Sequence, residues 1–458
     1  MNKQIHELLF GLIAWGTLFL FTCCESENKE NHIIPSSPLD LKAGISEMEL
    51  WNPPVDAIHV DPMLGNDEKG NGSSDKPYKS FKPVEWIKDK VYVIKRSTTI
   101  EMEGLMFFAD GVTLASYGEG DRPVLKCSTS AHAVSTDWFG NDDITIRDVE
   151  IEANKATSCV IFRDNSKNSK LINCKLHGGY WGLRALNYID GLYVENTEIF
   201  NTKDDGVFVK NSENIEFKNC YIHHVNRNWK SPSTSEKDAA GDGIQLEKCD
   251  NWHIHHNLID RSSSGNKFCF ISNNPSQESG IIENNWFIGP LVNGLSIYIG
   301  DGSNIIVRYN FIEGPSNSPF YSHAKNLDIY YNIFYKINGP LFVSHSAEIY
   351  NNLFFDMPMG IQGGNIIAKN NIFQLSSSDA TRFKVNNLVE ENNLFTTGEP
   401  MSNSFVGDPN FLDPANLDFH LSPNSICIDN GTGVDLYRDF EGNPVPEGHA
   451  PDIGVYEE

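Results

Sequence analysis

The chain has 458 residues, with 36 Lys and Arg against 61 Asp and Glu, and a formal net charge of -25. This excess of acid argues against duplex nucleic acid as a partner, because binding to phosphates requires a basic surface. The length and the 40% of hydrophobic residues are sufficient for a large folded domain.

The first residues have the pattern of an export signal. An apolar run from Leu8 to Phe21 precedes Cys23 and is too short for a good membrane-spanning helix, so it predicts a signal peptide over residues 1–22. The tetrad that ends in Cys23 resembles a bacterial lipobox, with Cys24 as the alternative acceptor and a simple cleaved signal as the other interpretation. The acidic segment after it resembles the tether of surface lipoproteins. We therefore expect a lipid anchor in the outer membrane, facing the cell surface or the periplasm.

Residues 23–56 contain four prolines and no hydrophobic periodicity, which predicts a tether or linker. The seven cysteines after residue 100 are an odd, scattered set without a CxxC pair, so we interpret them as small apolar core residues, with Cys269 as the possible exception.

An Asn or Asp recurs between short apolar segments through most of the remaining chain. All but one of the gaps between these residues lie between 19 and 28, and each unit holds strand-like triplets such as VFV and IQL. A period near 23 without helical segments predicts an all-β fold, a single right-handed parallel β-helix whose Asn side chains stack as a ladder. The marked positions are Asp148, Asn173, Asn196, Asn219, Asn257, Asn285, Asn310, Asn332, Asn352, Asn371 and Asn393.

These repeats resemble the pectate-lyase superfamily of parallel β-helix proteins. The segment from His59 to Phe81 resembles the N-terminal part of such secreted proteins, and GDPNFLDPANLDFHLSPNSICIDNG with DIGVYE resembles their C-terminal cap. The resemblance implies one β-helix domain over residues 57–458, with the cap over about 400–458. It also implies a carbohydrate-active protein, although the fold itself does not specify a reaction.

The apolar alternation of the strands predicts which side chains face outward. It places Phe208, Gln245, Cys269 and Ser296 in one outward row that begins one coil earlier at Arg184. A second outward row consists of Gly182, Gly206, Gly243, Lys267 and Gly294. Lys267 lies between glycines there, so an extended polymer would find it uncovered; alternatively, it is an ordinary solvated lysine.

The stretch RNWKSPSTSEKDAAGDGIQL makes the one long gap, between Asn219 and Asn257. In the superfamily, an insertion at this turn forms a wall of the substrate groove, which implies that Arg227, Trp229 and Lys230 overhang the face that carries Gln245. An aromatic ring such as Trp229 suits the apolar side of a sugar. The alternative is an exposed loop of no consequence.

A uronic-acid lyase requires a base for the C5 proton and a group that neutralises the neighbouring carboxylate. Lys267 as the base, with Arg261 and Arg227 as carboxylate binders, satisfies both needs. Residues 200–270 have a net charge of only -1, which an anionic polymer would tolerate best. We therefore expect a polysaccharide lyase that acts on a uronic-acid-containing chain by β-elimination.

Calcium held by Asp204, Asp205 and Asp242 is the alternative way to neutralise the carboxylate. DDG followed by GDGIQL resembles family-9 pectate lyases, but their base lysine would fall on Gln245 and further calcium ligands near Trp181 and Phe208. GLSIYIGDG, which contains Tyr298, resembles a coil of the chondroitinase B and alginate lyase group, although their arginine would fall near Ile299.

Two other functions remain open. The same three aspartates satisfy the need of a polygalacturonase-like glycoside hydrolase for converging carboxylates, and a non-catalytic glycan-binding β-helix would use the groove without a base. His224 is a candidate groove residue, and the alternating His253 and His255 are interpreted as surface or turn residues rather than as a zinc site.

Overall fold

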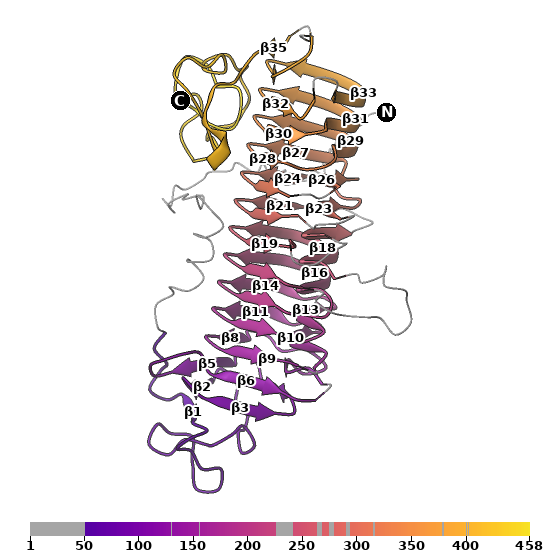
Figure 1. Cartoon of the computed structure of the whole chain (residues 1–458). Coiled ribbons are helices and arrows are strands. Elements are labelled where there is room, and N and C mark those ends of the chain that lie inside the picture. The colour runs from indigo at the N-terminus through magenta and orange to yellow at the C-terminus, as the bar shows by residue number, and fades with distance from the viewer. Residues whose placement is uncertain are drawn as a thin grey trace, which may run out of the picture. The chain divides into compact units, whose positions relative to one another are not determined.

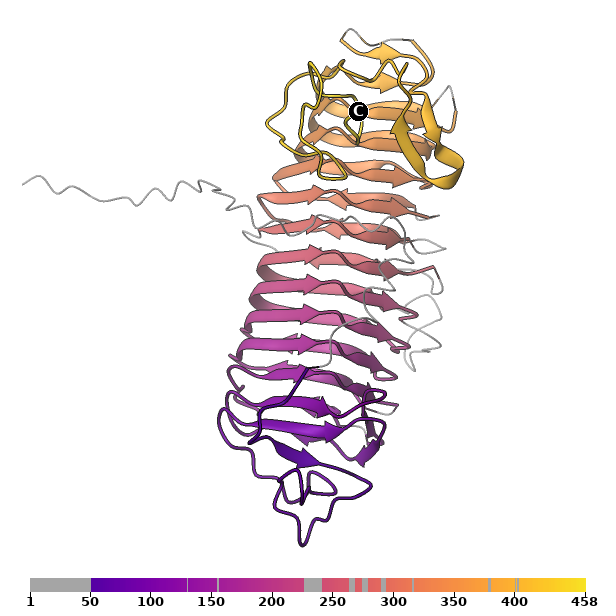
Figure 2. The same ribbon diagram turned by 90° about the vertical axis from the view of Figure 1, so that its left-hand side faces the viewer.

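The computed structural model describes residues 51–129, 131–154, 156–225, 241–262, 268–273, 279–289, 294–314, 317–377, 380–399, 401 and 403–458. These residues form a parallel β-helix of stacked coils (Figure 1; Figure 2), which confirms the predicted all-β fold class. The described ranges contain no α-helix, only one 3-10 turn, η1, Pro414–Asn416. None of their helical segments is long and apolar enough to cross a membrane.

Each coil contributes strands to three faces, which we name A, B and C, and successive coils pair in parallel. Face A contains β4 Leu105–Met106, β7 Val134–Ser135, β10 Ser158–Arg163, β13 Trp181–Leu186, β20 Phe270–Asn273, β23 Leu295–Ile299 and β26 Ser318–Ser322. Face B contains β1 Ile58–Val60, β2 Val91–Lys95, β5 Thr113–Tyr117, β8 Thr145–Arg147, β11 Lys167–Ile172, β14 Asp190–Glu195, β21 Gly280–Glu283, β24 Ile305–Arg308 and β27 Asn326–Tyr330.

Some strands run without interruption from face A into face B, and in the first two of them the chain bends at residues with positive φ, such as Asn211 at 51° and Lys248 at 55°. These are β16 Val207–Lys218, β18 Ile244–His255, β29 Leu341–Tyr350, β31 Met359–Lys369 and β33 Thr381–Glu391.

Face C is a separate sheet of fourteen strands in the described residues. They are β3 Thr99–Met102, β6 Val124–Cys127, β9 Glu150–Glu152, β12 Lys175–His177, β15 Glu198–Phe200, β17 Tyr221–His223, β19 Leu258–Asp260, β22 Trp286–Ile288, β25 Phe311–Glu313, β28 Ile333–Tyr335, β30 Leu353–Met357, β32 Ile372–Leu375, β34 Leu394–Phe395 and β35 Phe405–Val406.

The core is built of rows of equivalent side chains, one from each coil. Val207, Ile244, Phe270 and Ile297 are paired in register on face A, and all are fully buried. Because such residues pack both within a coil and against the coils on either side, the whole column excludes water. The seven described cysteines are free and buried, as expected for core residues.

The predicted Asn ladder exists, but as two ladders rather than one. From Asn257 to Asn393 the side-chain amides are buried. Each side-chain oxygen accepts hydrogen bonds from the coil before it, as in the 3.0 Å bond from Asn332 Nδ2 to Asn352 Oδ1. In the earlier coils, Asp148, Asn173 and Asn196 instead occupy the preceding corner position, with φ between 49° and 56°. The sequence marks both ladders with the same residue type, so spacing alone does not separate them.

The C-terminal segment folds back along the outer surface of face C (Figure 1). Its hairpin, β36 Phe411–Asp413 and β37 Asp418–Leu421, brings Phe419 and Leu421 into one cluster with Trp286, Phe311 and Ile333 of face C. Asn351 Nδ2 also donates to the carbonyls of Asp452 and Gly454 at 2.9 and 3.0 Å. These contacts cover the outward apolar side chains of the later face C strands.

Candidate functional site

A carboxyl group and a guanidinium group both contact Trp181, at the start of β13 on face A. The indole Nε1 donates to Asp205 Oδ2 over 3.2 Å, and the guanidinium carbon of Arg184 lies 4.1 Å from the centre of the Trp181 rings. Arg184 is in register with Phe208 of the next coil and lies 5.8 Å from its ring. The ring therefore positions a cation and a carboxyl group side by side on the outer surface of face A.

Three carboxyl groups lie at the turns that lead into face A. Asp205 and Asp242, from consecutive coils, are each 4% exposed, and the Asp242 amide donates to Asp205 Oδ1 over 2.7 Å. Asp242 Oδ1 accepts in turn from the Phe268 amide over 2.9 Å. Asp204 precedes Asp205 and is only half-buried, so it is the most accessible of the three.

Burial dominates the ionisation of the pair. It raises the pKa of Asp204 to about 6, against the opposing effect of Arg184. The pKa of Asp205 is raised well above its ordinary value, first by burial and then by the charges of Asp242 and Asp204. A carboxyl group that keeps its proton near neutral pH can donate it to a substrate, which is the property of a general acid.

A second arginine lies beside this group, at the end of β10. The guanidinium carbon of Arg163 is 4.0 Å from the centre of the Trp138 rings, and the indole of Trp138 is 62% exposed. His132 is also close, because the charges of Arg163 and Arg184, after burial, help lower the pKa of His132 to about 4. Sequence reasoning did not single out Trp138, Arg163 or His132, because they come from turns and strand ends in separate coils.

Several predicted site residues lie outside the described residues: Lys267, Arg227, Trp229 and Lys230. The predicted lipidation site at Cys23 lies outside them as well. Their proposed roles stay predictions.

Arg261 was predicted to bind the substrate carboxylate from the surface, and this placement is wrong. Its side chain has no exposed surface, and its guanidinium donates to the carbonyl of Val225 over 3.1 Å and to that of Gly241. Arg261 therefore holds together the two ends of the inserted segment rather than contacting a ligand.

The predicted outward rows need a second correction, because the register is displaced by two residues. Gln245 pairs with Phe208 and with Ile271, and Ile271 pairs with Tyr298. Cys269 and Ser296 are fully buried instead of outward. Cys269 and Ser296 occupy the same row as Gly243 in the next two coils. A Cβ added at Gly243 would lie 2.7 Å from Cγ2 of Ile259, so side chains in this row point into the core.

The other predicted groove residues are distributed over two faces. Gln245 and Tyr298 are half-buried in the outward row of face A, where Tyr298 stacks on Tyr321 with ring centres 5.8 Å apart. His224 lies directly after the face C strand β17, and its Nδ1 is 2.6 Å from Nδ1 of His223. The structure thus brings Arg184, Asp204, Asp205 and Asp242 together and places His224 elsewhere.

The calcium interpretation receives no support from the donor set. Both oxygens of Asp205 already accept hydrogen bonds, and no group of three or more His, Cys, Asp or Glu in the described ranges could hold a metal ion. His253 and His255 each bind a carboxylate, Glu283 over 2.7 Å and Glu216 over 3.1 Å. His253 is half-exposed on face B, as expected, whereas the prediction of a surface or turn position is wrong for His255, whose side chain is buried with 7% exposed.

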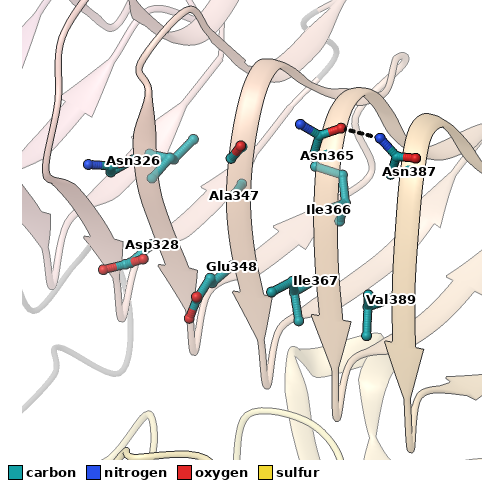
Figure 3. Close-up of a pocket in the computed structure, with 11 residues that line it drawn as sticks. Asn326, Asp328, Ala347, Glu348, Asn365, Ile366, Ile367, Asn387 and Val389 are labelled. Carbon is teal, nitrogen blue, oxygen red and sulfur yellow. Dashed lines mark hydrogen bonds between the residues drawn. The ribbon is translucent and has the colours of Figure 1, made fainter.

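A separate hollow of about 340 Å³ lies across four later strands of face B, β27, β29, β31 and β33 (Figure 3). Asp328, Glu348, Ile367 and Val389 form one outward row there, and Asn387 Nδ2 donates to Asn365 Oδ1 over 2.7 Å. The residues that line this hollow are apolar, polar uncharged or acidic, and none is a cation. The hollow therefore lacks the neighbouring carboxyl and guanidinium groups of the site on face A.

Comparison with known proteins supports the fold. A family model described as "Right handed beta helix region" matches residues 124–277. The solved structure of XylC with xylose shares 11% identity, with a TM-score of 0.54, and the match covers 88% of this chain and 99% of that one. A mutant of the PL6 family alginate lyase AlyGC shares 11% identity, with a TM-score of 0.50, over 74% of this chain and 54% of that one. Pectate lyase Pel9A shares 16% identity, with a TM-score of 0.37, over 88% of this chain and 97% of that one. No curated protein sequence matches the chain. The family model, together with the two structures whose TM-scores are 0.54 and 0.50, supports the right-handed β-helix fold and nothing beyond the fold.

Proposed function

We propose that this protein is an exported polysaccharide-cleaving enzyme that hydrolyses a glycosidic bond, with Asp204 as the proton donor. The observation that carries the proposal is the accessible Asp204, with a pKa raised to about 6, beside the buried Asp205 and the cation of Arg184. Asp204 protonates the leaving oxygen as the bond between the sugar carbon and that oxygen breaks; water then adds its hydroxyl to the sugar carbon and gives its other proton back to the Asp204 carboxylate.

The surroundings of Asp204 support this role. Burial favours the protonated form of Asp204, and the charges of Asp242 and Asp204 add to burial in raising the pKa of Asp205. Arg184 faces outward on the neighbouring coil and is positioned by Trp181, so it is available to orient a bound sugar. The row that follows, from Phe208 to Tyr298, offers apolar and polar side chains along the coil axis.

Hydrolysis is favoured over β-elimination for a specific reason. The lyase interpretation used Arg261 as a carboxylate binder, but the guanidinium of Arg261 is buried against backbone carbonyls. The most accessible carboxyl group at the site, Asp204, has a pKa raised to about 6, which suits a proton donor. Export by the N-terminal signal and a lipid anchor at Cys23 are part of the proposal, because polysaccharides are met outside the cytoplasm.

The test is incubation with a panel of pectins, alginates, glycosaminoglycans and neutral glycans, with and without a chelator. Expected is a rise in reducing ends without the ultraviolet absorbance of an unsaturated sugar, unaffected by the chelator. Asp204→Asn should abolish it, whereas Asp190→Asn on face B should retain it. A rise in ultraviolet absorbance would instead identify a lyase. If neither reducing ends nor absorbance increased, the remaining interpretation would be a non-catalytic glycan-binding β-helix.

A further inference from the structure

Arg163 and Arg184 present their side chains from the same surface of face A. Ile161 pairs with Arg184, and Arg163 pairs with Leu186, so the two arginines are diagonal neighbours on adjacent strands. Diagonal positions of this kind are separated by about 7–8 Å between Cα atoms, which is within reach of long side chains. Two guanidinium groups are therefore concentrated on one patch.

Each guanidinium is held by an indole. Arg163 lies over Trp138 and Arg184 over Trp181, at 4.0 and 4.1 Å from the ring centres. Stacking fixes the plane of a guanidinium and leaves the N–H groups at its edge for hydrogen bonds. This is the arrangement in which an arginine binds a planar oxyanion with two parallel bonds.

Buried polar atoms at this patch have no partner within the described residues. They are Nε of Arg163, Nε of Arg184 and Nδ1 of His132. Arg163 is only 8% exposed, so water compensates little for the missing bond. A buried donor without an acceptor is costly, and its presence on two neighbouring cations indicates a missing acceptor.

The electrostatics indicate the charge of that acceptor. Burial lowers the pKa of both arginines, and the charge of Arg163 lowers the pKa of Arg184 further. Asp164 opposes the shift for Arg163, and Asp205 and Asp204 oppose it for Arg184, but only in part, because each net shift is downward. An anion between the two guanidinium groups would relieve both the repulsion and the unsatisfied donors.

We propose that Arg163, Arg184 and His132 form a subsite for an oxyanion carried on a sugar ring, either a carboxylate or a sulfate ester. The inference rests on the proposed function, since it assigns the sugar next to the bond cleaved at Asp204 to an acidic class. The guanidinium groups bind the oxyanion, and the exposed rings of Trp138 and Phe139 (62% and 86% exposed) offer an apolar surface to the sugar.

The test measures binding rather than cleavage, in the full chain carrying Asp204→Asn. Isothermal titration calorimetry compares a uronate oligosaccharide, a sulfated oligosaccharide and a neutral one of equal length. We expect one of the two anionic probes to bind at least about tenfold more tightly than the neutral one, with an affinity that falls as salt is added. The probe that binds identifies the oxyanion.

Arg163→Gln and Arg184→Gln should each weaken the anionic probe by about tenfold or more and leave the neutral probe unchanged. Arg163→Lys retains the charge but not the two parallel N–H donors of the guanidinium, so its affinity for the anionic probe should lie between those of the wild type and Arg163→Gln. Arg382→Gln is the matched control, because this guanidinium also lies over a ring, 4.3 Å from Phe395. Equal binding of neutral and anionic probes, or an unchanged affinity in both arginine variants, would overturn the subsite. Neither result would decide whether Asp204 cleaves the substrate, because that is measured separately by the reducing-end assay.

Discussion

Trp181 Nε1 donates to Asp205 Oδ2 over 3.2 Å, while the same indole carries Arg184 on its face. One side chain thus couples the carboxyl pair to the cation that faces the solvent. Because the two contacts use different parts of the ring, a substitution can remove one and keep the other.

Trp181→Phe retains a ring for Arg184 and removes the donor to Asp205. The hydrogen bond lowers the pKa of Asp205, so its loss should raise that pKa further. We expect cleavage at pH 7 to slow by roughly tenfold, since a hydrogen bond of about 1–1.5 kcal/mol corresponds to about that factor. Initial rates by the reducing-end assay check this, with Trp51→Phe on the far part of the chain as the control. A rate equal to that of the wild type would show that the bond does not serve the reaction.

Asp204 should give the activity and the stability the same response to acid, because both should fall as its carboxyl group loses the proton. As a proton donor with a pKa near 6, it should support cleavage below pH 6 and lose activity as the pH rises through that value. The folded pKa is above the ordinary 3.8, so the folded state binds the proton more tightly and the free energy of unfolding falls as the pH rises from about 4 to 6.

Asp204→Asn removes the unfavourable ionised carboxylate that forms at high pH. The variant should therefore be more stable at pH 8 by about 1–2 kcal/mol, after allowance for solvent screening, with no gain below pH 4. Urea unfolding at the two pH values measures the difference. Asp75→Asn, at an exposed position in the N-terminal segment, serves as the reference. A gain that is equal at both pH values would contradict the assignment.

The buried amide ladder from Asn257 to Asn393 should contribute far more to stability than the exposed hydrogen bond between Asn387 and Asn365. Asn332→Ala leaves the Val307 carbonyl and the amides of neighbouring coils without partners, at a cost of about 2–4 kcal/mol. Asn387→Ala removes only the exposed 2.7 Å bond to Asn365 and should cost under about 1 kcal/mol. Denaturant midpoints of the two variants give the comparison, and equal losses would contradict the role of burial.

His420 should make the C-terminal segment sensitive to alkali. Glu441 and Asp418 raise the pKa of His420 to about 9, so the stabilisation is complete below about pH 6.5 and is lost as the pH rises through 9. His420→Gln should therefore destabilise the protein at pH 6 by about 1–2 kcal/mol and have little effect at pH 10. Thermal unfolding at both pH values, with His449→Gln as the control, measures this; equal effects at pH 6 and pH 10 would refute the linkage.

The sequence by itself determined the coil. Asn and Asp spacing specified a parallel β-helix because each coil must return to the same corner, and the corner residues adopt positive φ, which Asn tolerates. Apolar alternation also predicted Phe208 and Gln245 in one outward row, and the two residues pair on face A, since inward and outward positions alternate along any strand.

Only the tertiary structure decided the register and the surroundings of each site residue. A displacement of two residues preserves the alternation along a strand, so the pattern could not choose between Cys269 and Ile271 as the neighbour of Gln245. Nor could the pattern show that Arg261 is buried, because the residue type alone does not indicate how far a charged side chain lies from the solvent. The grouping of Arg163, Arg184, Trp138 and Trp181 arises from stacking residues more than twenty positions apart, a relationship that exists only once the coils pair.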